Sequence, residues 1–132
     1  MIEYMSGMHG FSPAKASFPA SGALAKGVAV ALNASGKLVL ATGAAPAASM
    51  LGILEETATA DGQMCLVTLC GPDALLRVTA TGGTPIAGAK YDIAADGCSA
   101  NVADVTDPKV KVLGLWPGCT TLYMAVNISF AL

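Results

Sequence analysis

The first candidates for acid–base chemistry in this chain are its single histidine and a pair of adjacent glutamates. A hydrolytic triad needs a histidine as its base, but His9 lies in a segment broken by glycines, where nothing holds a catalytic geometry. Glu55 and Glu56 follow an apolar run and could suggest a general acid and base. Because neighbouring residues on a strand point to opposite faces, the two carboxylates cannot share a proton. We therefore predict no catalytic residues and a protein that is not an enzyme.

Four cysteines could instead form disulfides or bind a metal. Cys65 and Cys70 are an odd number of residues apart in one predicted strand, so their side chains would point to opposite faces of the sheet. The sequence has no C-x-x-C pair and one histidine, which leaves a zinc site without its usual ligand spacing. Cysteine side chains prefer to be buried. We expect these thiols, with those of Cys98 and Cys119, to be reduced and mostly packed.

Other polar motifs lack the spacing that their ligands require. The turn at Gly82, Gly83 and Thr84 has neither the spacing nor the Lys-Ser/Thr ending of a phosphate-binding loop. No lysine lies in the Met-Lys-Met or Asp-Lys-Ala context of a biotinyl or lipoyl carrier domain. No cofactor and no metal are therefore expected. Four aspartates do not match a calcium-binding EF-hand loop and are interpreted as solvated turn residues: Asp92, Asp96, Asp104 and Asp107.

The composition indicates a surface that is covered by something other than water. Hydrophobic residues make up 54% of the chain and charged residues 12%, about half the roughly 25% of ordinary soluble domains. The usual cover for such a surface is another subunit or a large partner. No run approaches 18 apolar residues, so a membrane is not the expected partner. The net charge of −2 and the scattered Lys and Arg residues argue against nucleic-acid binding.

The elements that must carry these residues change in character after residue 24. Residues 1–24 are punctuated by glycines and prolines and have no sustained period, so we expect an extended, irregular N-terminal arm. They lack the features of a secretory signal, and synthesis in a cytoplasm is the default expectation. The alternative is a flexible terminus. Four apolar side chains favour an arm that orders on a partner's surface: Tyr4, Met8, Phe11 and Phe18.

From residue 25 onward, short apolar runs alternate with turns at intervals of about ten residues, which predicts one compact all-β domain over 25–132, a sandwich or a small barrel. Gly, Asn and Asp in the turns accept positive φ. Trp116, at the end of one strand, either caps the core or anchors an oligomer interface. The predicted strands are 27–32, 37–41, 50–55, 64–70, 75–80, 89–93, 110–116 and 122–130.

The domain could contain two similar β units, at about 25–70 and 86–132. Gly27 and Gly36 each recur at one common interval along the chain, as Gly88 and Gly97. Farther on, the sequence LGIL at 51–54 is matched with LGLW at 113–116, and the strand that begins near Met64 with the one near Met124. The alternative is that β-proteins rich in small residues look self-similar by composition alone.

Two motifs in the first unit, GKLVLA at 36–41 and SMLGIL at 49–54, follow the arm in a familiar order. In order and spacing they resemble the capsid decoration (cement) proteins of tailed phages, of which the lambda head decoration protein is one. The resemblance is clearest over residues 22–70. It implies a compact β-tulip fold, no active site, and a virion protein on the outer surface of the expanded capsid, made in the host cytoplasm.

The resemblance also implies the partners. In that family, copies assemble as trimers on the shell, and the N-terminal arm joins strands of the major capsid protein. By position, the arm here would be residues 1–24, binding the shell through Tyr4, Met8, Phe11 and Phe18. The second β unit leaves a dimer as an alternative to the homotrimer. Other functions that fit the composition are a β-structural protein of a phage tail or fibre, and a non-viral β-rich interaction module.

Overall fold

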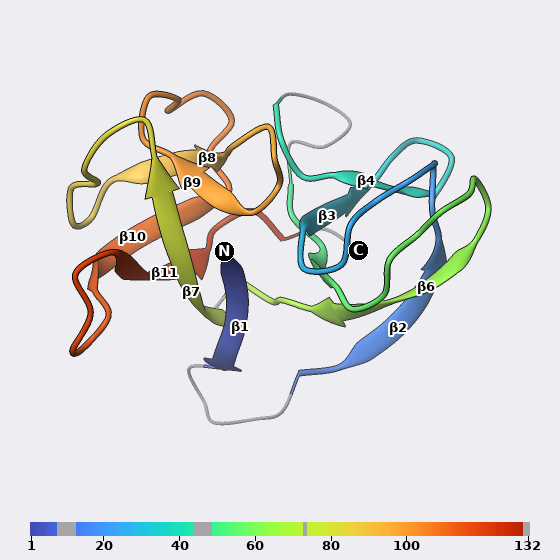
Figure 1. Cartoon of the computed structure of the whole chain (residues 1–132), viewed down its shortest axis with the longest axis horizontal. Helices are drawn as coiled ribbons and strands as arrows, with labels where there is room; N and C mark the ends of the chain where they lie inside the picture. The colour runs from blue at the N-terminus through green and yellow to red at the C-terminus, as the bar shows by residue number, and fades with distance from the viewer. Residues whose placement is uncertain (8–12, 44–48, 73, 131–132) are drawn as a thin grey trace.

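The computed structural model describes residues 1–7, 13–43, 49–72 and 74–130, and within them the fold is all-β, as the sequence predicts. The strands form two sheets that lie side by side (Figure 1). Each of the eight predicted strands is confirmed, and β1, β2 and β9 are additional. The strands are β1 (Ile2–Gly7), β2 (Lys15–Pro19), β3 (Ala29–Leu32), β4 (Leu38–Leu40), β5 (Gly52–Leu54), β6 (Met64–Leu69), β7 (Ala74–Thr81), β8 (Lys90–Ile93), β9 (Ser99–Asn101), β10 (Val110–Leu115) and β11 (Leu122–Asn127).

Strands β2 to β6 form a small closed barrel, which we call barrel 1. The strands are hydrogen-bonded neighbours in the order β2-β6-β5-β3-β4, and every pair is antiparallel. A parallel bridge between Ala20 and Leu38 joins the end of β2 to β4 and closes the ring. The N–H of Ser21 donates to the carbonyl of Leu38 at 3.0 Å beside that bridge. A barrel this small is filled by its own side chains, so it is a core and not a channel.

Strands β7 to β11 repeat the same ring, which we call barrel 2. Their order is β7-β11-β10-β8-β9. When the strands of each barrel are counted along the chain, both rings have the order first, fifth, fourth, second, third. A parallel pairing of β7 with β9 closes this ring, as the bridge between β2 and β4 closes barrel 1. Strand β1 lies outside the repeat, antiparallel to the first part of β7. The chain therefore contains one five-stranded topology twice, with one extra strand.

The first part of each repeat has the register that the sequence predicts. In barrel 1, the N–H of Gly27 donates to the carbonyl of Leu54 at 2.8 Å. In barrel 2, the N–H of Gly88 donates to the carbonyl of Val112 at 2.7 Å. These two glycines therefore have the same role at the start of the second strand of each ring.

The later part of the repeat has a register different from the predicted match of 51–54 with 113–116. The N–H of Leu51 donates to Val30 O at 2.8 Å, and the N–H of Lys109 donates to Tyr91 O at 3.0 Å. Val30 and Tyr91 are equivalent, so Lys109 is the equivalent of Leu51. The interval between Leu51 and Lys109 is shorter than the interval between Gly27 and Gly88. The predicted match of 51–54 with 113–116 is therefore wrong. The sequence comparison follows the apolar pattern, and the buried Lys109 interrupts that pattern at the true equivalent of Leu51.

Within residues 1–24, the described segments 1–7 and 13–24 contain two regular strands rather than an irregular arm. Strand β1 pairs with β7 and β2 pairs with β6, both in antiparallel ladders. The side chain of Ile2 is buried in the core. These strands end at Gly7 and Pro19. They are too short for their alternation of apolar and polar residues to stand out from the turn residues around them.

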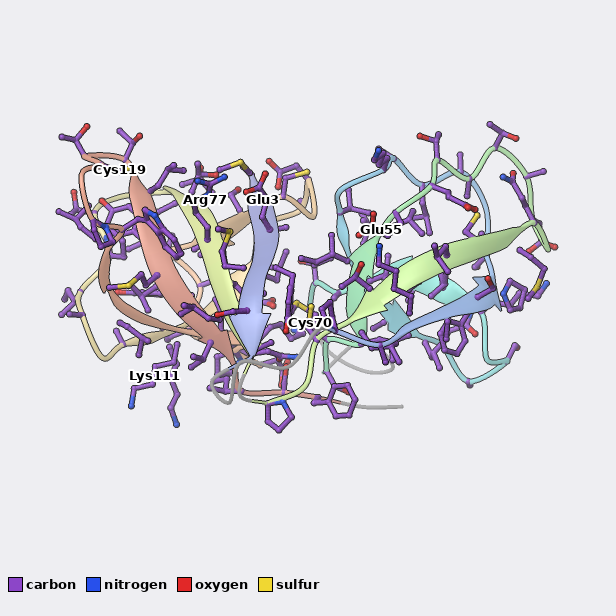
Figure 2. All side chains as sticks on the ribbon, turned by 90° about the horizontal axis from the view of Figure 1, so that it is seen from below. Glu3, Glu55, Cys70, Arg77, Lys111 and Cys119 are labelled. Atoms are coloured by element: carbon purple, nitrogen blue, oxygen red, sulfur yellow. The ribbon has the colours of Figure 1, made fainter. Side chains whose placement is uncertain are left out.

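The two barrels share a hydrophobic junction. Val28, just before β3, and Val30 on β3 contribute to the cluster inside barrel 1, whereas Ala29 and Ala31 belong to a second cluster that continues into barrel 2. Alternate residues of a strand point to opposite faces, so β3 is buried on both sides. The small alanine side chains allow the barrels to approach closely. Cys70 lies between the barrels in this junction (Figure 2).

Buried polar groups fix the position of one barrel on the other. Nζ of Lys109 donates to Oδ1 of Asp92 at 2.6 Å and to the carbonyl of Gly43, in the loop after β4, at 2.9 Å. Oδ2 of Asp92 accepts the N–H of Gly43 at 2.9 Å. The hydroxyl of Thr42 donates to the carbonyl of Ile93 at 2.7 Å. Gly43 of barrel 1 is therefore held by an ion pair of barrel 2 whose charges are hydrogen-bonded and buried.

Candidate functional site

The paired glutamates that could suggest catalysis each bond to strand β6. Oε1 of Glu55 accepts a hydrogen bond from the hydroxyl of Thr68, and Oε2 of Glu56 accepts the N–H of Leu66 at 3.3 Å. The two carboxylates therefore bond to separate groups and stabilise the edge of barrel 1. Within the described residues, no group of three or more His, Cys, Asp and Glu side chains could hold a metal ion.

The four aspartates do not share one environment. Oδ1 of Asp96 accepts the N–H of Cys98 at 2.8 Å, and Oδ1 of Asp104 accepts the N–H of Thr106 at 2.9 Å, which are bonds typical of turns. Asp92 is different, because its side chain is 1% exposed and pairs with Lys109. The expectation of a solvated turn residue is wrong for Asp92. The sequence carries no sign of its partner, which lies 17 residues away.

The four cysteines are free thiols. Cys65 lies in the core of barrel 1 and Cys70 in the junction cluster, so they face opposite sides of the sheet, as their spacing predicts. Burial raises the pKa of the Cys70 thiol to about 12, and the nearby Glu55 carboxylate contributes to this increase. Burial also raises the pKa of Cys65. Neither thiol has the lowered pKa of a reactive cysteine.

The aromatic residues expected to bind partners contact the protein's own core where the structure describes them. Tyr4 on β1 is half-buried against the junction cluster, and Phe18 on β2 is half-buried against the core of barrel 1. Met8, Phe11 and also His9 lie outside the described residues.

Trp116 follows β10 and is partly covered by Arg77. The guanidinium carbon of Arg77 lies 5.8 Å from the centroid of the Trp116 ring, within the range of a cation–π contact. The same guanidinium group donates to Oε2 of Glu3 through Nε, at 3.1 Å, and through Nη2. Figure 2 shows Glu3 beside Arg77 on barrel 2. Arg77 therefore links β1 to the end of β10.

Within the described part of the chain, one edge of strand β2 has no strand partner along most of its length. Just before β2, the N–H of Leu69 in β6 donates to the carbonyl of Ala14 at 2.9 Å. Because hydrogen-bonded positions alternate along an antiparallel pair, the even-numbered residues of β2 bond to β6. The alternate residues Lys15 and Ser17 therefore direct their N–H and C=O groups away from β6, as Pro19 directs its C=O. Among the named strands, only β6 pairs with β2. Lys15 and Ser17 are exposed.

The equivalent edge in barrel 2 is occupied. Strand β1 covers it, with Glu3 opposite Arg77 and the N–H of Thr79 donating to Met1 O at 2.8 Å. Arg77 on β7 is the equivalent of Ser17 on β2. The repeat thus shows that this edge of the fold accepts an antiparallel strand. Sequence reasoning missed the β2 edge. Pro19 was a usable signal for it, because proline within a strand indicates an edge strand.

A second exposed surface lies at the end of barrel 2. Ile86 is 70% exposed, Leu115 is 50% exposed and Leu113 is 40% exposed. Beside them is a groove of about 440 Å³ between the loop before β8 and the hairpin of β10 and β11. Large exposed apolar side chains that gather at one place mark interaction sites. The residues that line the groove are Thr84, Pro85, Ala87, Val112, Gly114, Leu115, Thr120 and Tyr123.

None of the protein-family models, curated proteins and solved structures compared with this chain matches it. Over the residues that the structure describes, no helix has the length and apolar character needed to cross a membrane. Among the described residues, two surfaces are candidates to carry a function: the β2 edge and the apolar end of barrel 2.

Proposed function

We propose that this protein is a non-enzymatic structural protein that binds the outer surface of an expanded phage capsid and stabilises it. The motifs GKLVLA and SMLGIL, which carry the resemblance to cement proteins, include β4 and β5, on either side of β3 in barrel 1. The observation that supports binding most directly is the β2 edge of the same barrel. Its outward N–H and C=O groups are the groups that an added strand pairs with.

The duplicated fold supports this role for β2. In barrel 2, the equivalent edge carries β1, which adds to β7 through main-chain hydrogen bonds. An extended segment of the major capsid protein would add to β2 in the same antiparallel manner. Main-chain pairing then supplies attachment, and many copies on one shell supply avidity.

Stabilisation by this route needs no chemistry. A ligand that binds the expanded shell in preference to the unexpanded shell shifts the equilibrium toward the expanded state by mass action. The rigid junction between the barrels suits that role, because a binder that stays ordered loses little conformational entropy on attachment.

Co-sedimentation with capsid shells tests the proposal. The intact chain is mixed with expanded and with unexpanded shells, and the amount bound per shell is measured. Saturable binding to expanded shells, at a fixed number of copies per capsid subunit, supports the cement function. Absence of binding to any shell contradicts it and favours a phage tail or fibre protein, for which purified tails are the next binding partner to assay.

A further inference from the structure

Strand β1 shows which side chains suit a strand that is added at this edge of the fold. Glu3 on β1 lies opposite Arg77 of β7 and accepts hydrogen bonds from its guanidinium group. The neighbouring residues Ile2 and Tyr4 point to the other face of the strand. There Ile2 is buried in the core, and Tyr4 packs against the same cluster. The strand that occupies the barrel 2 edge therefore has the order apolar, acidic, apolar.

Strand β2 has two matching faces beside its vacant edge. Lys15 and Ser17 are exposed on one face. Ala16 and Phe18 are half-buried on the other, where Phe18 packs against the core of barrel 1. An antiparallel strand added beside β2 would place its alternate side chains next to these two faces. At the register of β1 on β7, the equivalent of Ile2 would lie opposite Phe18.

The exposed face of β2 carries an ammonium group that is available to an added strand. Among the described residues, Lys15 forms no ion pair. On the β6 side, Thr68 lies opposite Lys15, and its hydroxyl donates to Glu55. Lys15 can therefore pair with a carboxylate that arrives on the vacant side, as Arg77 pairs with Glu3 in barrel 2.

We propose that the β2 edge selects an extended segment of another protein in which apolar residues alternate with at least one Asp or Glu. The apolar side chains cover Ala16 and Phe18. The carboxylate lies opposite Ser17, where its diagonal neighbour Lys15 is within reach of a long side chain. The segment comes from another protein because β1 of this chain is already held on β7.

This inference rests on the proposed function, since it specifies which segment the edge accepts. Main-chain pairing alone would accept any extended segment, whereas side chains on the two faces of the edge add specificity. The selection thus names the chemistry of the partner strand: apolar toward the barrel and acidic toward Lys15.

Synthetic peptides added to the intact protein test this selection without a capsid. The probe is a capped hexapeptide with the β1 sequence IEYMSG, because this sequence occupies the equivalent edge. One matched peptide carries Glu3→Lys, and a second carries both Ile2→Ser and Tyr4→Ser. NMR titration at low salt follows the amide signals of Lys15 and Ser17. The acidic peptide should bind about three- to tenfold more tightly than the Glu3→Lys peptide. The serine peptide should bind more weakly than the probe, because it buries no apolar side chain.

Lys15→Glu is the matched protein variant, since it reverses the charge beside the edge. Lys15 is exposed, so circular dichroism and thermal unfolding should show a retained fold. The variant should prefer the Glu3→Lys peptide over the acidic one. The control is Lys90→Glu, which makes the same change in net charge at an exposed position of barrel 2 and should keep the wild-type preference.

Absence of shifts at Lys15 and Ser17 with every peptide overturns the proposal, as does equal binding of the acidic and basic peptides. A folded Lys15→Glu variant with the wild-type preference overturns it too. Shell binding separates this inference from the proposed function. Equal binding of expanded shells by the wild type and Lys15→Glu would remove the selection and leave the cement function standing. Peptide binding as expected, with no binding to any shell, would support the selection and remove the cement function.

Discussion

Lys109 and Asp92 form a buried ion pair in barrel 2 at the positions that Leu51 and Ala31 hold in barrel 1. One repeat thus has two apolar residues, Leu51 in the core of barrel 1 and Ala31 in the junction cluster, at the positions where the other has a charged pair. The difference follows from the neighbours, because only the barrel 2 pair bonds to the backbone of Gly43. A buried ion pair is weak evidence for net stability, but it fixes the geometry of the groups it joins. Here it fixes Gly43, just after β4.

Lys109→Ala is predicted to be strongly destabilising. It leaves the carboxylate of Asp92 buried without its cation, and such a loss costs about 3–5 kcal/mol in the free energy of unfolding. Urea denaturation followed by tryptophan fluorescence measures it. The double variant Asp92→Ala, Lys109→Leu, which copies the barrel 1 pair, should be more stable than Lys109→Ala, because uncharged backbone groups rather than a carboxylate then lack partners. A double variant less stable than the single one would count against this account.

Gly97→Ala is predicted to loosen the junction between the barrels. Gly97 has a φ of 74°, and an added Cβ would lie 2.8 Å from Cδ2 of Leu40 and 3.0 Å from Cβ of Val28. Backbone strain and overpacking together should cost about 2–4 kcal/mol. Gly36 is the matched control, because it has the same φ of 74° and its added Cβ would meet nothing within 4 Å. Gly36→Ala should cost only about 1 kcal/mol, and equal costs would contradict a tight junction.

Ser17→Pro is predicted to abolish shell binding while leaving the fold intact. The N–H of Ser17 points away from β6, so its loss breaks no bond within barrel 1, and proline is tolerated on such an edge. The same change removes a donor that an added strand needs. Ser17→Ala keeps the N–H and should bind as the wild type does. Co-sedimentation with expanded shells and thermal unfolding are measured together. If Ser17→Pro folds and binds normally, the shell does not attach through this edge.

The four thiols are predicted to separate into two reactivity classes. Cys98 and Cys119 are partly exposed, whereas Cys65 and Cys70 are buried with raised pKa values. Because the thiolate is the nucleophile, a thiol reagent at neutral pH should label two cysteines in the folded protein and all four after denaturation. Mass spectrometry of the labelled peptides identifies them. Rapid labelling of Cys70 in the native state would show that the junction opens readily.

Ionisation of Cys70 should also make stability depend on pH at high pH. Its pKa is raised from 9.0 to about 12 on folding, so the thiolate is favoured in the unfolded chain. The contribution to the free energy of unfolding is therefore fully present below pH 9.0 and is lost as pH rises toward about 12. Comparison with Cys70→Ala isolates this slope, because the variant should lose less stability than the wild type over that interval.

The strands that the sequence predicts correctly are mostly short apolar runs bounded by well-marked turns. Strands β3 and β11 are examples. The short strand β9, Ser99–Asn101, contains small and polar residues, and it forms because β7 and β8 pair with it from either side. Strand β1 likewise depends on pairing with β7, far along the chain. Such strands are fixed by tertiary contacts and leave little periodic trace in the sequence.

The candidate surfaces were less predictable than the fold. Tyr4 and Phe18 are aromatic in a segment that looks irregular, which favours an interpretation as partner contacts, but both pack on the protein's own cores. The β2 edge becomes visible only through comparison with β7, because its binding groups are backbone atoms common to all residues. The apolar end of barrel 2 brings together residues that lie far apart in the sequence, in the loop before β8 and in the hairpin of β10 and β11. Neither feature has a side-chain motif.

The pairing of β1 with β7 has a consequence for the order in which the chain can assemble during synthesis. The N-terminal amino group of Met1 donates to the hydroxyl of Thr79 at 2.6 Å, and these residues are 78 positions apart. At roughly 5–20 residues per second, a ribosome takes on the order of 4–15 seconds to reach the partner strand. Barrel 1 can close in that interval, whereas β1 waits with its edges unpaired. An emerging chain thus carries an unpaired strand together with the β2 edge, and pairing of such edges in the wrong combination is the misfolding that this order of synthesis favours.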